Sequence, residues 1–370
     1  MYLMLEDEKV LYFDLEDGTV QTVKEELVPF SLRGGLQTGS TLMVALNNLE
    51  LLRDWLSSRM LSLSRENAKQ IYAAFNLEQS NSTSARVKFS LACKALSLQD
   101  SYWIKSENDA TNWGDNDLKV NRFSEIVDIA LSGNYPSVTE NLKNPQLTTK
   151  GLFRKAWIRD KGLWLIKADR TDSSLHARME VLASDILKCV KSDTLTFVEY
   201  ELTEVNGETV SKCMNFSKKH YSFVEAREVM LYCSATGVDF LHWLEDNGIN
   251  GFADVPVIDY LVANTDRHTE NYGFLMDNRT GCLVGFQKLF DFNLALVSDY
   301  FNKSVEDTIS QTLNDGQSIY GSLKRFCKDS SVLINFCKLQ ELYQVYPEYV
   351  SILDAVVNRA KHYVELKKLL

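Results

Sequence analysis

Alternating apolar and polar positions near the N-terminus give way to helical spacing after about forty residues. Residues 9–23 read KVLYFDLEDGTVQTV, with two apolar-rich stretches on either side of the turn signal at 16–18. This pattern predicts a small β-hairpin. Across residues 42–60 the apolar side chains recur every three or four positions, which predicts an amphipathic helix.

A second helix is expected to follow, with Ser64 as its N-cap, and its apolar residues are Ala68, Ile71, Tyr72 and Phe75. Residues 78–87 predict a polar loop, and a short helix is expected at 123–131. The glycine-bearing stretch 33–39 lacks the buried strand and the Lys-Ser/Thr pair that a phosphate loop requires, so we interpret it as a surface loop.

From about residue 146 the pattern changes to strand pairs separated by a helix. In chain order the predicted elements are strand 152–158, strand 163–167, a helix that begins at Ser174, strand 194–202 and strand 208–213. Two hairpins with a helix between them resemble the small lobe of a nucleotide-binding kinase.

After Phe216 the chain becomes mainly helical, apart from strand-like pieces at 272–275 and 283–289. The tail from 308 to 370 predicts several amphipathic helices. We therefore expect an α+β protein with a two-lobed, protein-kinase-like fold, whose small lobe is mixed α/β and whose large lobe is mainly helical. The expected division is an N-terminal accessory region at 1–100, a small lobe at 101–216 and a large lobe at 217–370.

The charge balance narrows the choice of partners. The chain carries 40 basic and 50 acidic residues, a formal net charge of −10. A nucleic-acid binder shows an excess of basic residues, so direct nucleic-acid binding is not expected. The sequence contains no apolar run long enough to span a membrane, so no membrane partner is expected either.

Cysteine usage and the N-terminus point to a cytoplasmic protein. The seven cysteines form no Cys-x-x-Cys pair and their number is odd, which argues against a zinc ribbon or a disulfide framework. Reduced thiols in the cytoplasm explain them more simply. The first residues are acidic, whereas a signal peptide needs a basic start.

One segment carries the most chemical information. Asp266 is followed five residues later by Asn271, and Asp291 comes after a predicted hairpin. This order is used for phosphoryl transfer. The first Asp can accept the proton of a hydroxyl nucleophile, and the Asn and the second Asp offer oxygen ligands to Mg²⁺ beside the phosphates of ATP.

Two upstream residues complete the set. Lys167 ends an apolar strand, from which a lysine can reach nucleotide phosphates, and Glu180 lies on the following helix, well placed to pair with it. Each residue alone has an ordinary structural explanation, and their order along the chain carries the kinase hypothesis. His268 fits two roles, holding phosphate or orienting the loop, and the orienting role is favoured.

These motifs resemble the HipA-like serine/threonine kinases, whose catalytic core is related to the phosphatidylinositol kinases. The resemblance covers about residues 146–300. It rests on NTDRHTENYGFL at 264–275 and LFDFN at 289–293, and the upstream pieces at 148–151, 155–157, 165–167 and 180–184 agree with it. The resemblance is weaker in the helical tail. Asn293 stands where ordinary protein kinases have Gly after Asp-Phe.

The resemblance implies a role for each matching residue. Asp266 is the implied catalytic base, Asn271 and Asp291 the implied Mg²⁺ ligands, and Lys167 with Glu180 the implied phosphate-binding pair. Further nucleotide contacts are implied for a loop over the phosphates and for the hinge beside adenine: Thr148, Thr149, Lys150 and Gly151 in the loop, and Met214, Asn215 and Phe216 in the hinge.

The expected function is therefore ATP- and Mg²⁺-dependent phosphorylation of a Ser or Thr hydroxyl in a protein, with autophosphorylation on Thr148 or Thr149 as a further expectation from the family. The resemblance also suggests a toxin–antitoxin context with a small DNA-binding antitoxin as partner.

Two alternatives remain, a kinase for a lipid or a small molecule and a catalytically inactive pseudokinase scaffold. A net charge of −10 would repel anionic lipid headgroups. Every expected catalytic position holds a suitable residue type, which argues against the pseudokinase.

Overall fold

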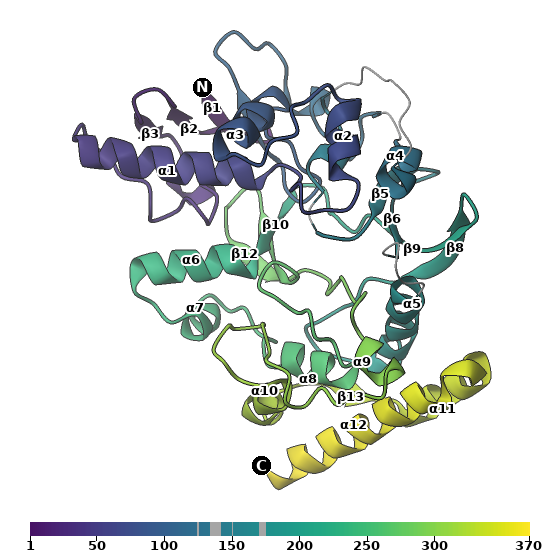
Figure 1. Cartoon of the computed structure of the whole chain (residues 1–370). Coiled ribbons are helices and arrows are strands. Elements are labelled where there is room, and N and C mark those ends of the chain that lie inside the picture. The colour runs from purple at the N-terminus through teal and green to yellow at the C-terminus, as the bar shows by residue number, and fades with distance from the viewer. Residues whose placement is uncertain (124–125, 134–141, 150, 170–174) are drawn as a thin grey trace.

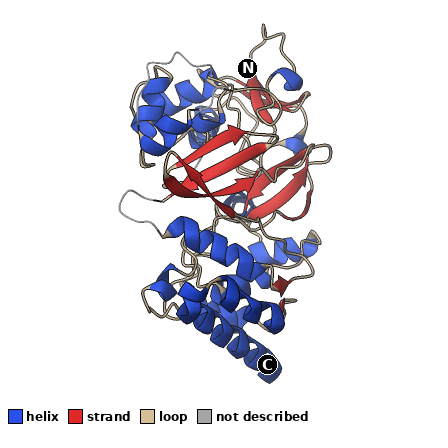
Figure 2. Ribbon diagram, turned by 90° about the vertical axis from the view of Figure 1, so that its right-hand side faces the viewer, coloured by secondary structure: helices blue, strands red, loops and turns tan. Residues whose placement is uncertain are grey.

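The computed structural model describes residues 1–370 except 124–125, 134–141, 150 and 170–174. Figure 1 shows the N-terminal region at the top, the helical C-terminal half at the bottom, and sheets between them. Figure 2, turned by 90°, shows the same order, with the largest group of strands above the helices of the C-terminal half. The molecule is therefore α+β with two lobes, as expected.

A four-stranded antiparallel sheet opens the chain, in the order β3-β2-β1-β4. Its strands are β1 (Tyr2–Leu5), β2 (Glu8–Phe13), β3 (Val20–Thr22) and β4 (Tyr102–Lys105). The predicted hairpin is the β2–β3 pair, and the pattern missed both β1 and β4. Strand β4 lies beyond the boundary predicted at residue 100, yet it pairs with β1.

Four helices and two 3₁₀ turns accompany this sheet. They are α1 (Leu42–Ser58), α2 (Ala68–Ala74), α3 (Thr83–Ala92), α4 (Val127–Ser132), η1 (Glu25–Leu27) and η2 (Trp113–Asp115). Helix α1 confirms the amphipathic helix predicted across residues 42–60. Two expectations were wrong: Asn67, not Ser64, precedes α2, and α3 begins inside the predicted polar loop, where the Ser82 hydroxyl caps it by accepting from Ala85 N.

The small lobe contains a second antiparallel sheet, in the order β5-β6-β9-β8, with helix α5 packed against it. Its elements are η3 (Pro145–Leu147), β5 (Lys155–Arg159), β6 (Leu163–Ala168), α5 (His176–Leu187), β8 (Glu201–Val205) and β9 (Glu208–Met214). The strand predicted at 152–158 begins three residues later, and the one predicted at 194–202 begins only at Glu201. Ser174, the expected start of the helix, lies outside the described residues.

The large lobe is mainly helical and contains a three-stranded antiparallel sheet, β10-β11-β12. Strand β10 was missed, and β11 and β12 match the predicted strand pieces. The remaining elements are β7 (Val190–Lys191), β10 (Tyr221–Glu225), α6 (Ala226–Thr236), α7 (Phe240–Asp246), α8 (Asp254–Leu261), β11 (Gly273–Asp277), β12 (Leu283–Phe286), α9 (Val297–Tyr300), α10 (Ile319–Phe326), β13 (Leu333–Ile334), α11 (Phe336–Val345), η4 (Pro347–Tyr349) and α12 (Val350–Leu369). None of the described helices combines the length and the apolar character needed to cross a membrane.

The N-terminal region is built into both lobes. Buried side chains of β1, β2 and α1 belong to one apolar core with α5 and the helices of the large lobe. Buried side chains of α2 and α4 belong to a second core with β5, β6 and β9. A polar link adds to the first core, because Glu6 lies 2.8 Å from His220 Nδ1 and accepts from Asn278 Nδ2 at 2.7 Å.

Gly273, at the start of β11, directly follows the segment that carries Asp266 and Asn271. It pairs with Glu225 on β10, and a Cβ there would lie 2.1 Å from Val224 O and 2.9 Å from Glu225 Cα. Because backbone cannot move aside cheaply, we expect Gly273→Ala to destabilise the fold by about 1–3 kcal/mol, measured by urea unfolding.

Gly162→Ala is the matched control. Its nearest neighbour would be Trp164 Nε1 at 3.4 Å, an ordinary contact, so a change within about 0.5 kcal/mol is expected. Equal stability of the two variants would contradict the close approach of β10 to Gly273.

Candidate active site

A cavity of about 610 Å³ lies between the two lobes and gathers most of the residues singled out from the sequence. Those that line it are Thr148, Thr149, Gly151, Lys167, Asn215, Phe216, Asp266, His268, Asn271 and Asp291. Glu180 reaches the cavity only through Lys167. Met214 does not line it, because its side chain is exposed on the outer side of β9. Lys150 lies outside the described residues.

The Lys167 ammonium joins the two lobes at the back of the cavity. It donates to Glu180 Oε1 at 2.6 Å and to Asp291 Oδ1 at 2.8 Å. Glu180 is fully buried on α5, and its second oxygen accepts from the Ser211 hydroxyl at 2.6 Å. The small lobe thus supplies the lysine and one carboxylate, and the large lobe supplies the other carboxylate.

Burial and neighbouring charges shift the pKa values of Lys167 and Asp291 in opposite directions. Burial alone would lower the pKa of Lys167, but Asp291 and Glu180 outweigh it and raise that pKa well above its usual value. Burial would raise the pKa of Asp291, but Lys167 and then Lys155 hold it below its usual range. Both groups are therefore charged at neutral pH, and Asp291 is available as an anionic ligand.

Asp291 occupies a strained backbone position. Its φ is 61°, in the left-handed region that residues with a side chain seldom adopt. The Tyr200 hydroxyl accepts from the Asp291 amide at 3.1 Å, and the Tyr200 ring lies 5.0 Å from the Lys167 ammonium. Such strain persists where surrounding contacts fix the residue, and here they aim its carboxylate at Lys167.

The loop from Asp266 to Asn271 is held by its own side chains. Asn271 Nδ2 donates to Asp266 O at 2.8 Å, which fixes the amide and leaves Asn271 Oδ1 as its free acceptor atom among the described residues. Burial, and then the charge of Asp291, raise the pKa of Asp266. His268 Nδ1 lies 3.3 Å from the Glu270 amide, in keeping with an orienting role within the loop.

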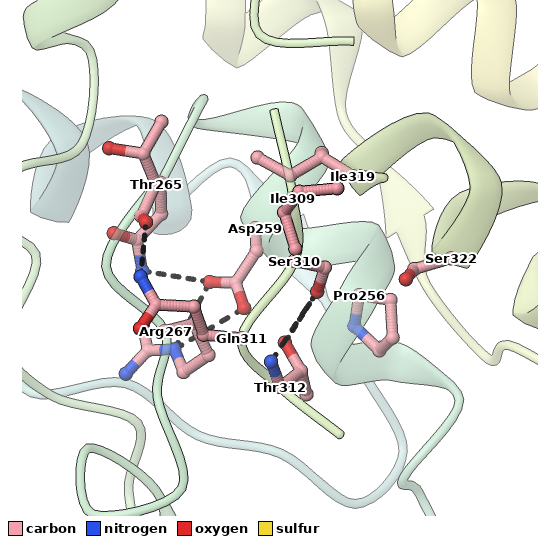
Figure 3. Close-up of a pocket in the computed structure, with 11 residues that line it drawn as sticks. Pro256, Asp259, Thr265, Arg267, Ile309, Ser310, Gln311, Thr312, Ile319 and Ser322 are labelled. Carbon is pink, nitrogen blue, oxygen red and sulfur yellow. Dashed lines mark hydrogen bonds and ion pairs between the residues drawn. The ribbon is translucent and has the colours of Figure 1, made fainter. Parts of the chain in front are cut away.

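Arg267 anchors this loop to the core of the large lobe. Its Nη1 donates to Asn271 O and to Phe290 O, both at 2.7 Å, and its Nε donates to the buried Asp259 at 3.1 Å. Figure 3 shows the Asp259 carboxylate facing Arg267 beside a small hollow of about 10 Å³, room for one water molecule. A single guanidinium therefore ties the loop before Asn271 to the segment that carries Asp291.

The threonines at the cavity mouth are engaged with backbone. Both Thr148 Oγ1 and Thr149 Oγ1 donate to Pro145 O, at 3.2 Å and 2.6 Å, and Trp157 Nε1 donates to Thr149 Oγ1 at 2.8 Å. Gly151 has a φ of 99°, and a Cβ there would lie 2.4 Å from the ammonium of Lys155. The positive φ therefore favours glycine at this position, and the Lys155 ammonium would have to move aside for any other residue.

Aromatic rings form the wall at the hinge end of the cavity. The rings of Phe216 and Phe290 lie 5.6 Å apart, and Phe223 meets Phe290 edge to face at 5.5 Å. Asn215 N donates to Leu163 O at 2.7 Å, which fixes the chain as it leaves β9. This apolar end suits a flat ring system, and the lysine end suits phosphates.

Sequence reasoning gave no role to two further cavity residues, Lys155 and Asn293. Lys155 lies opposite Lys167 across β5 and β6 and is 6% exposed, and its ammonium makes no hydrogen bond or ion pair with the described residues. Burial lowers its pKa to about 8, against the attraction of Asp291. The register of the β5–β6 hairpin was the signal that could have revealed it, because it places the two lysines opposite each other.

The donor set fits a divalent cation that is shared with phosphates. The described residues contain no group of three or more His, Cys, Asp and Glu side chains that could bind a metal by themselves. Mg²⁺ is usually held by one or two carboxylates together with substrate phosphates. The Asp291 carboxylate and the amide oxygen of Asn271, both facing one cavity, provide such an incomplete set.

No protein-family model matches this sequence, and no curated protein matches it. Solved structures do. One is HipA of Shewanella oneidensis MR-1, from the structure of its toxin–antitoxin system with HipB and operator DNA. It has a TM-score of 0.51 and 11% identity, over 99% of this chain and 95% of that chain. Another is the Helicobacter pylori proinflammatory kinase CtkA, with a TM-score of 0.41 and 14% identity, over 60% of this chain and 93% of that chain.

The similarity to HipA concerns the fold alone, and it extends over nearly the whole chain. The protein has a HipA-like, two-lobed kinase fold. At this level of identity the chemistry has to be argued from the cavity itself.

We expect Glu180→Ala to lower the free energy of unfolding by about 3 kcal/mol, because it removes one partner from a buried ion pair. Lys167→Met combined with Glu180→Leu should recover at least half of that loss, since apolar side chains then replace the buried pair, and the Asp291 carboxylate that loses Lys167 still lies in the field of Lys155. Urea unfolding of both variants gives the comparison.

Ser211→Ala is the control, because it removes only the hydroxyl that donates to Glu180 and should cost about 1 kcal/mol. A double variant no more stable than Glu180→Ala would contradict the expected cost of leaving one charge of the pair without its partner.

Proposed function

We propose that this protein is an ATP- and Mg²⁺-dependent protein kinase that transfers the γ-phosphate of ATP to a serine or threonine hydroxyl. The observation that carries the proposal is the meeting of Lys167, Asp266, Asn271 and Asp291 in one cavity between two lobes, although they come from distant parts of the chain. Phosphoryl transfer depends mainly on positioning and electrostatics, which such a cavity supplies.

In this proposal the nucleotide lies along the cavity. Its base would pack among Phe216, Phe223 and Phe290, and its phosphates would face the two lysines on β5 and β6. Lys155 would add a second positive charge beside Lys167, and the backbone at Gly151 would approach closely because it carries no side chain. Asn215 and Phe216 follow β9 at the hinge, where adenine contacts are expected.

The chain's own residues divide the remaining work. Asn271 and Asp291 would hold the Mg²⁺ ion, which when bound neutralises charge on the phosphate oxygens. Asp266 would orient the acceptor hydroxyl and take its proton, and its raised pKa makes it a better proton acceptor than an ordinary aspartate. Arg267 would keep Asp266 and Asn271 in register without touching the nucleotide.

A second hollow supports a protein acceptor. It measures about 350 Å³, runs between α1 and α6, and shares walls with the main cavity at Gln99, Thr148 and Phe223. A groove that extends outward from the main cavity suits a length of polypeptide. A small-molecule acceptor would need no such extension, and we keep it, with a lipid acceptor and an inactive scaffold, as the alternatives.

HipA of Shewanella oneidensis is solved together with HipB and operator DNA. We propose by analogy that this protein also works in the cytoplasm, in a toxin–antitoxin context with a small DNA-binding partner. Co-purification with a protein encoded beside it would support this part of the proposal.

Autophosphorylation on Thr148 or Thr149 stays a prediction. Both hydroxyls donate to Pro145 O, so the loop must rearrange before either of them can reach ATP. A phosphate there would add about −1.5 to −2 charge beside the nucleotide and should weaken ATP binding. Phosphopeptide mapping after incubation with MgATP checks this, and modification elsewhere or nowhere would contradict it.

The two aspartates should separate binding from transfer. We expect Asp291→Asn to weaken Mg²⁺-dependent ATP binding and transfer together. We expect Asp266→Asn to leave ATP affinity nearly unchanged while transfer falls about 10²-fold or more, the scale of losing a general base. Calorimetric titration with ATP and intact mass after incubation with MgATP and lysate proteins give the two measurements.

Circular dichroism of both variants controls for folding. Wild-type transfer rates in Asp266→Asn would rule out the proposed base. Wild-type protein that binds MgATP but phosphorylates neither itself nor any lysate protein would favour the inactive scaffold.

A further inference from the structure

Asn293 is the feature of the cavity that the proposed mechanism leaves unused. It is 6% exposed and lines the cavity two residues after Asp291. Between them Phe292 is fully buried in the core, where the Arg267 guanidinium lies 4.8 Å from its ring. With Phe292 directed into the core, the two polar side chains on either side of it both reach the cavity.

Among the described residues the side-chain amide of Asn293 has no hydrogen-bond partner, whereas three other amides of the cavity wall are engaged. Asn271 donates to Asp266 O, Asn215 Oδ1 accepts from Ser217 N, and Gln287 Oε1 accepts from Lys288 N. Asn293 Oδ1 is buried and accepts no hydrogen bond from any residue that the structure describes. Buried polar atoms are nearly always paired in native proteins, so an unpaired one at a cavity wall points to a bound group that completes it.

We propose that Asn293 Oδ1 is a third protein ligand of the divalent cation, beside Asp291 and Asn271. The inference rests on the proposed function, since the cation is the one that accompanies the nucleotide. An oxygen acceptor repels phosphate oxygens but suits a hard cation such as Mg²⁺ or Mn²⁺. One oxygen of Asp291 is already engaged by Lys167, so a neutral ligand nearby adds coordination without adding charge.

Manganese binding tests the proposal directly. Free Mn²⁺ is counted by electron paramagnetic resonance in the presence of saturating ADP, for wild type and for Asn293→Ala. The Mn²⁺ dissociation constant of the variant should rise about 10-fold. The affinity for ADP in EDTA should stay within twofold, because the ligand acts on the metal and not on the nucleotide.

Two further variants make the result specific. Gln287→Ala truncates another amide of the cavity wall, one whose oxygen is already occupied, and it should leave Mn²⁺ affinity unchanged. Asn293→Cys replaces a hard ligand by a soft one, so it should favour Cd²⁺ over Mn²⁺ relative to wild type. The melting temperature of metal-free Asn293→Ala should be no lower than that of wild type, since no hydrogen bond is lost.

The outcomes distinguish this proposal from the proposed function. If wild type binds neither ADP nor Mn²⁺ in its presence, the proposed function fails. If wild type binds both and Asn293→Ala has the same Mn²⁺ affinity, the ligand assignment is wrong while the function stands. A loss of ADP affinity in EDTA would show that the amide contacts phosphate, which also overturns the assignment.

Discussion

The buried ammonium of Lys167 is the group on which the rest of the arrangement depends. It lies between Glu180 of α5 and Asp291 of the large lobe, at 2.6 Å and 2.8 Å. A buried charge is tolerated only where opposite charges and hydrogen bonds compensate it, so the two carboxylates must stay where they are. This requirement fixes α5 against the small-lobe sheet and draws the segment after β12 toward that sheet.

In the large lobe, the position of the Asp291 carboxylate depends on backbone contacts as well as on side chains. Arg267 binds the carbonyls of Asn271 and Phe290, so the residues before Asn271 and those before Asp291 cannot shift independently. Gly273 allows β11 to lie close against β10, and the loop from Asp266 to Asn271 ends just before that contact. The positions of Asp266 and Asp291 are therefore set by the packing of β11 against β10 and by the hydrogen bonds of the Arg267 guanidinium.

The candidate site residues could be predicted from the sequence because their residue types and their order along the chain match those used for phosphoryl transfer. Lys167 after an apolar strand, Glu180 on a helix and the Asp266–Asn271 spacing all led to one cavity. Strand pairings between segments far apart in the chain could not be predicted. Strand β4 joins β1 across about a hundred residues, and no local pattern announces such a partner.

The remaining differences have local causes. Helix α3 starts inside a polar stretch because Ser82 caps it, and polar composition was taken for a loop. The sequence could not show that Asn293 Oδ1 lacks a hydrogen-bond partner among the described residues, because this depends on how distant segments pack around it. Lys155 was overlooked for a related reason, since its importance comes from lying opposite Lys167 across a hairpin.

The N-terminal region packs against both lobes and so holds them at a fixed angle. One of its faces shares a core with the helical lobe and another shares a core with the small-lobe sheet. Moving the two lobes apart would expose buried apolar side chains in at least one of these two cores. Ligand exchange that preserves both cores therefore leaves the angle between the lobes unchanged, and the apolar contacts of the N-terminal region set how far the lobes can separate.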